Sequence, residues 1–241
     1  MWGTIPLRDR GTEMQISVED PAEYAARALQ IALETRGVEV VGGVRARHQY
    51  PDDAPLPEPQ GVELARRSSA PLLDDLRITD KVSQNLHAEL ALRAAGKVRR
   101  NEGSFAAGLD EMKAFLTEIG IDANAWHFMD GSGLSRQGLL TPNTVVKLLR
   151  FMYDSPVRTD WISLLPIAAQ DGSLGTRFGE TPAAGRVHAK TGSLAHVSAL
   201  SGYIERPDGT WLAFSILVNN FNGRTAEVRG VMDRICNLIL E

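Results

Sequence analysis

The tripeptide Lys190-Thr191-Gly192 is the group of residues best suited to chemistry, and it stands at the head of an alternating apolar run that continues to Ile204. A lysine on an edge strand places a cation beside a cleft, and a threonine hydroxyl can donate a hydrogen bond to a carboxylate. Glycine lets a ligand lie against the strand, as an added β-strand would. By itself the tripeptide is explained at least as well by a strand whose first lysine is solvated.

A second candidate group, Ser83-Gln84-Asn85, lies far upstream at the start of a helix-like stretch that runs to Gly96. A serine hydroxyl can donate and accept a hydrogen bond at once, and an asparagine amide can do both from its two ends. A serine that opens a helix is usually only an N-cap. The pattern predicts that Ser83 caps or opens this helix, and it leaves the chemical role open.

A third group, Asp130-Gly131-Ser132-Gly133, is too rich in glycine for a helix or a strand. An aspartate that caps backbone N–H groups in a tight turn explains this loop as well as a functional role does. Both interpretations stay open for Asp130, Ser132 and Ser135.

Longer blocks around these groups resemble the peptidase S13 family of low-molecular-mass penicillin-binding proteins, which are D-alanyl-D-alanine carboxypeptidases and endopeptidases. The block Asp80–Glu89 contains the pattern K-x-S-x-N-L-x-A-E, which begins at Lys81, Asp130–Arg136 reads D-G-S-G-L-S-R, and His188–Leu194 contains K-T-G-S-L. The blocks follow one another in the order of the family. The resemblance covers most of the chain from about Asp20 onward.

The resemblance implies catalytic roles for three residues. Ser83 would relay a proton toward the leaving amine, and Lys190 would supply positive potential and support that relay. Asn85 would hold the amide of the substrate.

The resemblance also implies a substrate-binding set. Thr191 and Ser193 would receive the terminal carboxylate, with Gly192 between them, and the backbone N–H of Ser193 would be one of two oxyanion donors. Asp130 and Ser132 are assigned to substrate binding by their place in the D-G-S-G-L-S block.

The nucleophile motif of the family, S-x-x-K, is absent, because no serine of the sequence is followed three positions later by lysine. In the family this motif lies near the N-terminus, and extra domains separate it from S-x-N. We therefore expect residues 1–18 to be a remnant of an inserted domain or a linker, and residues 19–241 to be the C-terminal part of the penicillin-binding transpeptidase-like domain. Acylation needs an activated serine, so we expect this chain alone to be inactive.

Three functions fit these observations. The favoured one is a serine-type D-Ala-D-Ala carboxypeptidase or endopeptidase that acts on peptidoglycan peptides, present here without its nucleophile. The alternatives are a non-catalytic module that binds peptidoglycan peptides, and a β-lactamase or esterase relative. An S-x-x-K segment encoded upstream would favour the enzyme over the binding module.

The elements that must position these residues follow from hydrophobic period, caps and breakers. Helices are predicted over residues 21–36, 71–77, 83–96, 105–119, 142–152 and 224–240, and strands over 38–41, 62–69, 187–204 and 211–218. The last two strands should form an antiparallel hairpin around Pro207-Asp208-Gly209, and the proline-rich stretch 50–61 should be a loop. This order predicts an α+β fold, an antiparallel sheet packed with helices, and the resemblance makes it a partial β-lactamase/transpeptidase-like fold.

Charge and composition limit the partners. A net charge of −4 and a pI near 5.8 argue against a nucleic-acid or anionic-membrane surface. No stretch approaches the roughly eighteen consecutive apolar residues of a membrane span. The resemblance implies peptidoglycan stem peptides and β-lactams as partners and a periplasmic or extracytoplasmic location. Apolar surface left uncovered could support a homo-oligomer.

The remaining candidates for chemistry have plainer explanations. Cys236 lies in an apolar stretch and is interpreted as a small core residue. His87 lies one turn from Ser83, but the family pattern asks nothing of that position, so a surface or packing role is favoured. His188 and His196 have no companions at metal-binding spacing. We therefore expect no metal site and no cofactor.

Overall fold

The computed structural model describes residues 4–11, 13, 16–48, 53–54 and 61–241, which fall into two compact units, Met1–Arg66 and Arg67–Glu241. The first unit contains the predicted helix, α1 (Pro21–Glu34), whose N-cap Asp20 accepts hydrogen bonds from the N–H groups of Ala22 and Glu23. None of its described residues is buried. The division expected after residue 18 stays a prediction, as does the relation of this unit to an inserted domain.

Two predicted strands are wrong. Residues 38–41 and 62–69 form no strand, and Val41 and Leu64 are 90% and 94% exposed. A strand needs a partner for its backbone hydrogen bonds, and β-propensity alone does not supply one. The predicted loop over 50–61 lies almost entirely outside the described residues.

Five helices of the second unit confirm predicted ones, and a sixth, over residues 158–164, was not predicted. Ser104 and Thr141 cap their helices by accepting from the N–H groups of Ala107 and Thr144. The helices are α2 (Leu72–Lys81), α3 (Asn85–Arg100), α4 (Phe105–Glu118), α5 (Pro142–Tyr153), α6 (Arg158–Leu164) and α7 (Thr225–Leu238), with short 3₁₀ turns η1 (Ala123–Ala125) and η2 (Gly172–Leu174). Among the described residues, no helix is both long and apolar enough to cross a membrane.

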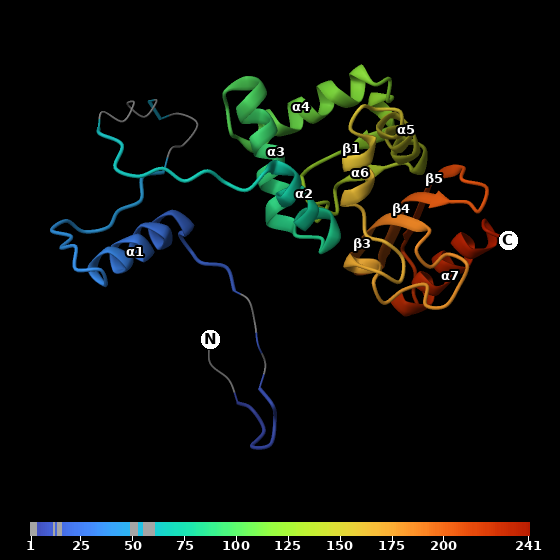
Figure 1. Cartoon of the computed structure of the whole chain (residues 1–241), viewed down its shortest axis with the longest axis horizontal. Coiled ribbons are helices and arrows are strands. Elements are labelled where there is room, and N and C mark those ends of the chain that lie inside the picture. Colours follow the sequence, from blue (N-terminus) through green and yellow to red (C-terminus); the bar gives the residue numbers. More distant parts are fainter. Residues whose placement is uncertain (1–3, 12, 14–15, 49–52, 55–60) are drawn as a thin grey trace. The chain divides into compact units, whose positions relative to one another are not determined.

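The strand predicted over 187–204 is two strands. β3 (Val187–Leu194), β4 (Val197–Glu205) and β5 (Trp211–Asn219) form an antiparallel sheet in the order β3-β4-β5 (Figure 1), and a small second sheet pairs β1 (Trp126–His127) with β2 (Leu139–Leu140). The predicted hairpin between β4 and β5 is confirmed. A tight turn at Ala195-His196, with His196 at φ 63°, divides the longer run.

The burial pattern carries the signal for this turn. On the sheet face that carries the larger hydrophobic cluster, β3 contributes the buried residues Val187 and Ala189, at odd positions, whereas β4 contributes Leu200 and Ile204, at even positions. A two-residue hairpin pairs odd with even positions, as in Val187 opposite Ile204. The parity of the buried face must therefore change at the turn.

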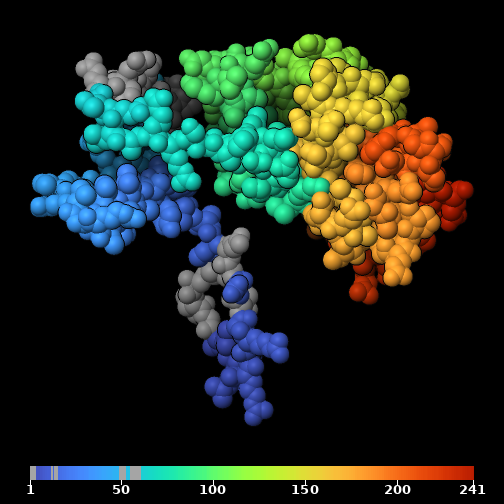
Figure 2. Space-filling model, in the orientation of Figure 1, coloured from blue at the N-terminus to red at the C-terminus, as the bar shows by residue number. Residues whose placement is uncertain are grey.

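Two hydrophobic clusters cover the two faces of the sheet. The second unit forms one continuous body (Figures 1 and 2). On one face α7 contributes Met232 and Cys236 to the larger cluster. Cys236 is 0% exposed, which confirms it as a core residue, and burial raises the pKa of its thiol to about 12. On the other face α5 and α6 pack around Tyr203, whose hydroxyl donates to Leu149 O at 2.6 Å and accepts from Trp161 Nε1 at 2.9 Å.

The junction between α2 and α3 corrects the predicted cap. Gln84, and not Ser83, is the N-cap of α3, and its Oε1 accepts from the N–H of His87 at 3.0 Å. Ser83 adopts a left-handed backbone, φ 60°, and the N–H of Gln84 donates to Thr79 O at 3.2 Å. This is the pattern in which glycine usually ends a helix. A serine there costs roughly 1–2 kcal/mol of backbone strain.

We expect Ser83→Gly to raise the Tm of the chain and Ser83→Ala to leave it unchanged or lower it. Both variants lose the hydroxyl, but only glycine relieves the left-handed strain, by up to ~1 kcal/mol. Thermal unfolding followed by circular dichroism measures the difference. Equal Tm values for the two variants would show that Ser83 carries no strain.

We also expect the chain to self-associate. Large apolar side chains are exposed on the second unit, and within the described residues the outer edge of β5 has no strand partner. Sedimentation velocity should show mass that grows with concentration. Leu86 and Leu90 are 61% and 53% exposed one turn apart on α3, so changing both to lysine should reduce the association. A wild-type chain that stays monomeric at tens of micromolar would contradict the expectation.

Candidate active site

One hydrogen bond joins the two motifs that lie farthest apart in the sequence. The Nζ atom of Lys190 donates to the Oγ atom of Ser83 at 2.6 Å, and it also donates to Thr191 O at 2.8 Å. β3 is an edge strand of its sheet, as predicted, and the α2–α3 junction brings Ser83 to it. The lysine is half-buried and the serine is exposed, so the pair is accessible from solvent.

Asn85 and His87 follow on α3 and differ in their surroundings. Asn85 is the first residue of the helix, and its side chain is exposed and makes no hydrogen bond within the described part of the chain. His87 lies against α2, with Nδ1 4.0 Å from Asp75 Oδ1. Asn85 is therefore available to a ligand, whereas His87 already has a neighbour.

The electrostatics of Lys190 depend on burial and on Asp80, near the end of α2. Burial lowers the pKa of the Lys190 ammonium, and the negative charge of Asp80 offsets part of that effect. Burial likewise raises the pKa of the Asp80 carboxyl, and the Lys190 charge opposes it. A lysine with a lowered pKa exchanges its proton more readily near neutral pH.

Two residues that the sequence did not suggest contact the predicted carboxylate-binding side chains. Thr191 Oγ1 donates to Ser173 Oγ at 2.7 Å, and Arg229 of α7 donates from Nη2 to Ser193 Oγ at 2.9 Å. Hydroxyls and a guanidinium are suitable donors to a carboxylate. Their proximity arises from tertiary packing, and no local pattern links them to the K-T-G motif.

The outer edge of β3 is partly covered. Ala168 N–H donates to Val187 O at 2.9 Å, and Ala189 N–H donates to Pro166 O at 2.9 Å. Backbone groups of an antiparallel strand alternate between its two neighbours, so Thr191 and Ser193 direct theirs to the same outer edge. Beyond residue 189 this edge has no backbone partner among the described residues, which leaves space for an extended peptide.

The loop that holds Asp130 and Ser132 is fastened to α3. The Glu89 carboxylate accepts from Ser132 Oγ at 2.7 Å, from Ser132 N at 3.0 Å and from Gly131 N at 3.1 Å. Desolvation would raise the pKa of Glu89, but these hydrogen bonds outweigh it and the pKa lies below its ordinary value. A side chain at Gly131 would meet Ala88 O at 2.8 Å, so this close approach requires glycine.

Within the loop, the Asp130 carboxylate accepts from Gly133 N at 2.9 Å and from Ser135 N at 2.6 Å. The polar groups of Asp130 and Ser132 are thus engaged in shaping the loop. Their assignment to substrate binding stays a prediction.

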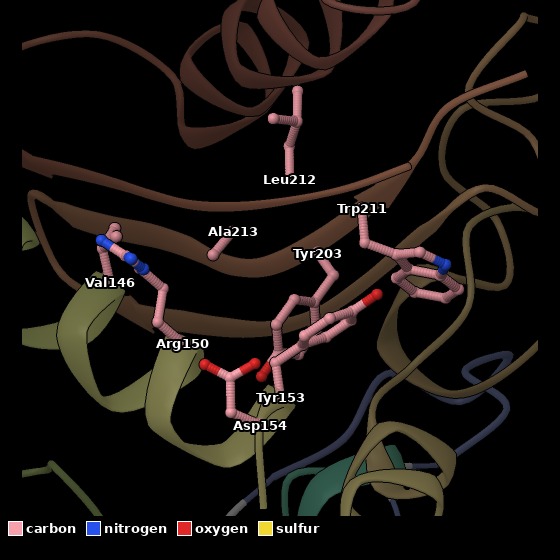
Figure 3. Close-up of a pocket in the computed structure, with 8 residues that line it drawn as sticks. All are labelled: Val146, Arg150, Tyr153, Asp154, Tyr203, Trp211, Leu212 and Ala213. Atoms are coloured by element: carbon pink, nitrogen blue, oxygen red, sulfur yellow. The ribbon is translucent and has the colours of Figure 1, made fainter. Parts of the chain in front are cut away.

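A separate hollow of about 370 Å³ lies between α5 and the strands β4 and β5. Figure 3 shows Arg150 and Asp154 on its α5 side and the rings of Tyr153, Tyr203 and Trp211 along its wall. None of the predicted site residues lines it. The hollow is therefore distinct from the Lys190–Ser83 centre.

Comparison with known proteins agrees with the resemblance seen in the sequence. The D-alanyl-D-alanine carboxypeptidase of Actinomadura sp. (strain R39) is 37% identical in an alignment of 231 residues that covers 92% of this chain and 41% of that protein. The D-alanyl-D-alanine carboxypeptidase DacB of Haemophilus influenzae is 32% identical over 212 residues, 87% of this chain and 43% of that protein. The chain thus spans less than half the length of these relatives.

Solved structures confirm the predicted fold class. Penicillin-binding protein 4 of H. influenzae, solved with a β-lactam, matches with a TM-score of 0.80 and 29% identity over 94% of this chain and 53% of that chain. A class A β-lactamase from Bacteroides cellulosilyticus matches with a TM-score of 0.53 and 17% identity, a likeness of fold alone. Residues 1–238 match the D-Ala-D-Ala carboxypeptidase 3 (S13) family, and the chain belongs to that family.

Proposed function

We propose that this chain supplies the substrate-binding wall of a serine-type D-Ala-D-Ala carboxypeptidase or endopeptidase that acts on peptidoglycan peptides outside the cytoplasm. The observation that carries the proposal is the 2.6 Å hydrogen bond from Lys190 Nζ to Ser83 Oγ. A lysine that merely begins a strand would be solvated, whereas this one is half-buried and directed at the hydroxyl of the S-x-N motif. Family membership supports the same assignment.

The geometry supports a proton relay. Because Lys190 donates to Ser83 Oγ, the hydroxyl proton of Ser83 is free to be donated to the leaving amine of the substrate. The ammonium then returns a proton to Ser83, and burial favours that transfer by lowering the pKa of Lys190. No metal is needed for this transfer.

The substrate peptide would lie along the open edge of β3, where Ser193 N–H contributes one oxyanion donor. Gly192 keeps the strand surface clear, and the hydroxyls of Thr191 and Ser193 receive the terminal carboxylate. Asn85 holds the substrate amide from the opposite side. Asp130 and Ser132 complete the wall through the loop that Glu89 fastens.

Acylation is assigned to a serine outside this sequence, because an activated serine of the S-x-x-K type does not occur in it. The absence of an S-x-x-K serine from this sequence is also compatible with an alternative function, a non-catalytic binding module. A non-catalytic module would bind the same peptides through the same residues, and no S-x-x-K segment would accompany it.

We expect a fluorescent penicillin to leave no covalent label on this chain after denaturing electrophoresis. A longer protein from the same gene that also carries an S-x-x-K segment should become labelled, because it supplies the attacking hydroxyl. Labelling of the present chain would mean that a serine within it is the nucleophile, with Ser83 and Ser132 the first to test by substitution. If the gene encodes no S-x-x-K segment and its product binds the peptide but takes no label, the binding module is favoured.

In an enzyme that contains both this chain and the S-x-x-K segment, we expect Lys190→Ala to lower kcat/KM on a D-Ala-D-Ala peptide by roughly 10²-fold or more. The variant loses both the proton donor to Ser83 and the positive charge beside the carboxylate. His87→Ala is the matched control and should stay within a few-fold of wild type. The opposite pattern, with His87 essential and Lys190 dispensable, would replace this mechanism with one based on histidine.

A further inference from the structure

A partly buried ion pair lies beside the Lys190–Ser83 centre, and the three motifs imply no role for either of its residues. Lys81, the last residue of α2, donates from Nζ to Asp171 Oδ2 at 2.6 Å and to Leu165 O at 2.7 Å. The other oxygen of Asp171 accepts from Ile167 N at 2.8 Å. The Lys81 side chain is 15% exposed and that of Asp171 is 43% exposed, and the second contact that each makes, to Leu165 O and to Ile167 N, fixes its direction.

The residues after Asp171 connect this ion pair to β3. Gly172 has φ +56°, and a Cβ atom there would lie 2.5 Å from Lys81 O, so the backbone of η2 rests directly on the end of α2. The next residue, Ser173, accepts from Thr191 Oγ1 at 2.7 Å. The turn Asp171-Gly172-Ser173 therefore contacts α2 through its first two residues and β3 through its third.

The two ends of this turn are next to the two ends of the catalytic hydrogen bond. Ser83 follows Lys81 by two residues, and Lys190 directly precedes Thr191. Both α2 and β3 pack on η2, which makes the turn their shared neighbour. We propose that Lys81 and Asp171 are positioning residues, and that their ion pair, acting through the turn 171–173, sets the hydroxyl of Ser83 against the amino group of Lys190.

An ion pair suits this task better than apolar contacts would. Half-buried charges add little net stability, but the donors of Lys81 fix its direction toward both Asp171 and Leu165 O. A displacement of 1 Å between catalytic groups can cost about 10²-fold in rate. The inference rests on the proposed role of Ser83 and Lys190, but the geometry it predicts can be measured without turnover.

The test is nuclear magnetic resonance on the whole chain with isotope-labelled lysine and serine, in which only five lysines must be assigned. The wild type should show a nuclear Overhauser effect between the Lys190 Hε and Ser83 Hβ protons. Asp171→Asn removes the negative charge that pairs with Lys81, leaves one acceptor oxygen where the wild type uses two, and keeps the shape of the side chain. We expect this cross-peak to disappear, and the pKa of Lys190, followed through its Cε shift, to rise as the ammonium regains water.

Asp233→Asn is the matched control. It breaks the Arg177–Asp233 pair, whose side chains are 12% and 20% exposed and which joins α7 to the loop after η2. It should lower stability without changing the Lys190–Ser83 cross-peak. If Asp171→Asn also lowers Tm but leaves the cross-peak and the pKa of Lys190 as in wild type, the ion pair is only structural and the proposal is wrong.

A milder change keeps the test decisive should Asp171→Asn fail to fold. Ser173→Ala leaves the ion pair intact and removes only the acceptor for Thr191. The cross-peak should weaken, because β3 loses its link to the turn. An unchanged cross-peak in a folded Ser173→Ala chain would overturn the proposal. A cross-peak that is kept in Lys81→Arg, which retains the positive charge, and lost in Lys81→Met, which does not, would support it.

Discussion

The hydrogen bond from Lys190 to Ser83 is the constraint on which the rest of the site depends. This hydrogen bond requires two unfavourable conditions at once, a left-handed backbone at Ser83 and partial burial of the Lys190 ammonium. Each costs free energy, so neither would persist unless the surrounding elements imposed it. The helix end at Thr79–Gln84 imposes the first condition, and the packing of β3 against its neighbours imposes the second.

Asp80 shows the cost of this arrangement. Burial raises the pKa of its carboxyl, and although the charge of Lys190 opposes the rise, the net direction is upward. The folded state therefore favours the protonated carboxyl more than the unfolded chain does. Asp80 costs no stability below its ordinary pKa of 3.8, and the cost grows as the pH rises from 3.8 to the pKa of the folded state, above which it is complete. A costly carboxylate beside a desolvated lysine is typical of a site kept for function at the expense of stability.

The sequence predicted the features that depend on interactions between neighbouring residues, such as helix caps. The caps Ser104 and Thr141 bond to N–H groups three residues away, so sequence patterns that span one turn reveal them. The prediction of a strand over 38–41 was wrong because strand formation depends on backbone pairing with a segment distant in sequence, which a local pattern does not reveal. For the same reason Asp171, Ser173 and Arg229 could not be predicted from the sequence. Each contacts the site through side chains that are far apart in the sequence.

The spacing inside the S-x-N-L-x-A-E block has a physical explanation that the sequence alone did not give. Asn85 and Glu89 are four residues apart on α3, so they lie on the same side of the helix about one turn, 5.4 Å, from each other. Asn85 starts the helix beside Ser83, and Glu89 holds the loop of Asp130 and Ser132. One helix face therefore sets the distance between Ser83 and the loop that borders it. Inserting or deleting one residue between Asn85 and Glu89 would rotate Glu89 by about 100° around α3 and away from the loop, so the spacing itself is needed to hold Asp130 and Ser132 in place.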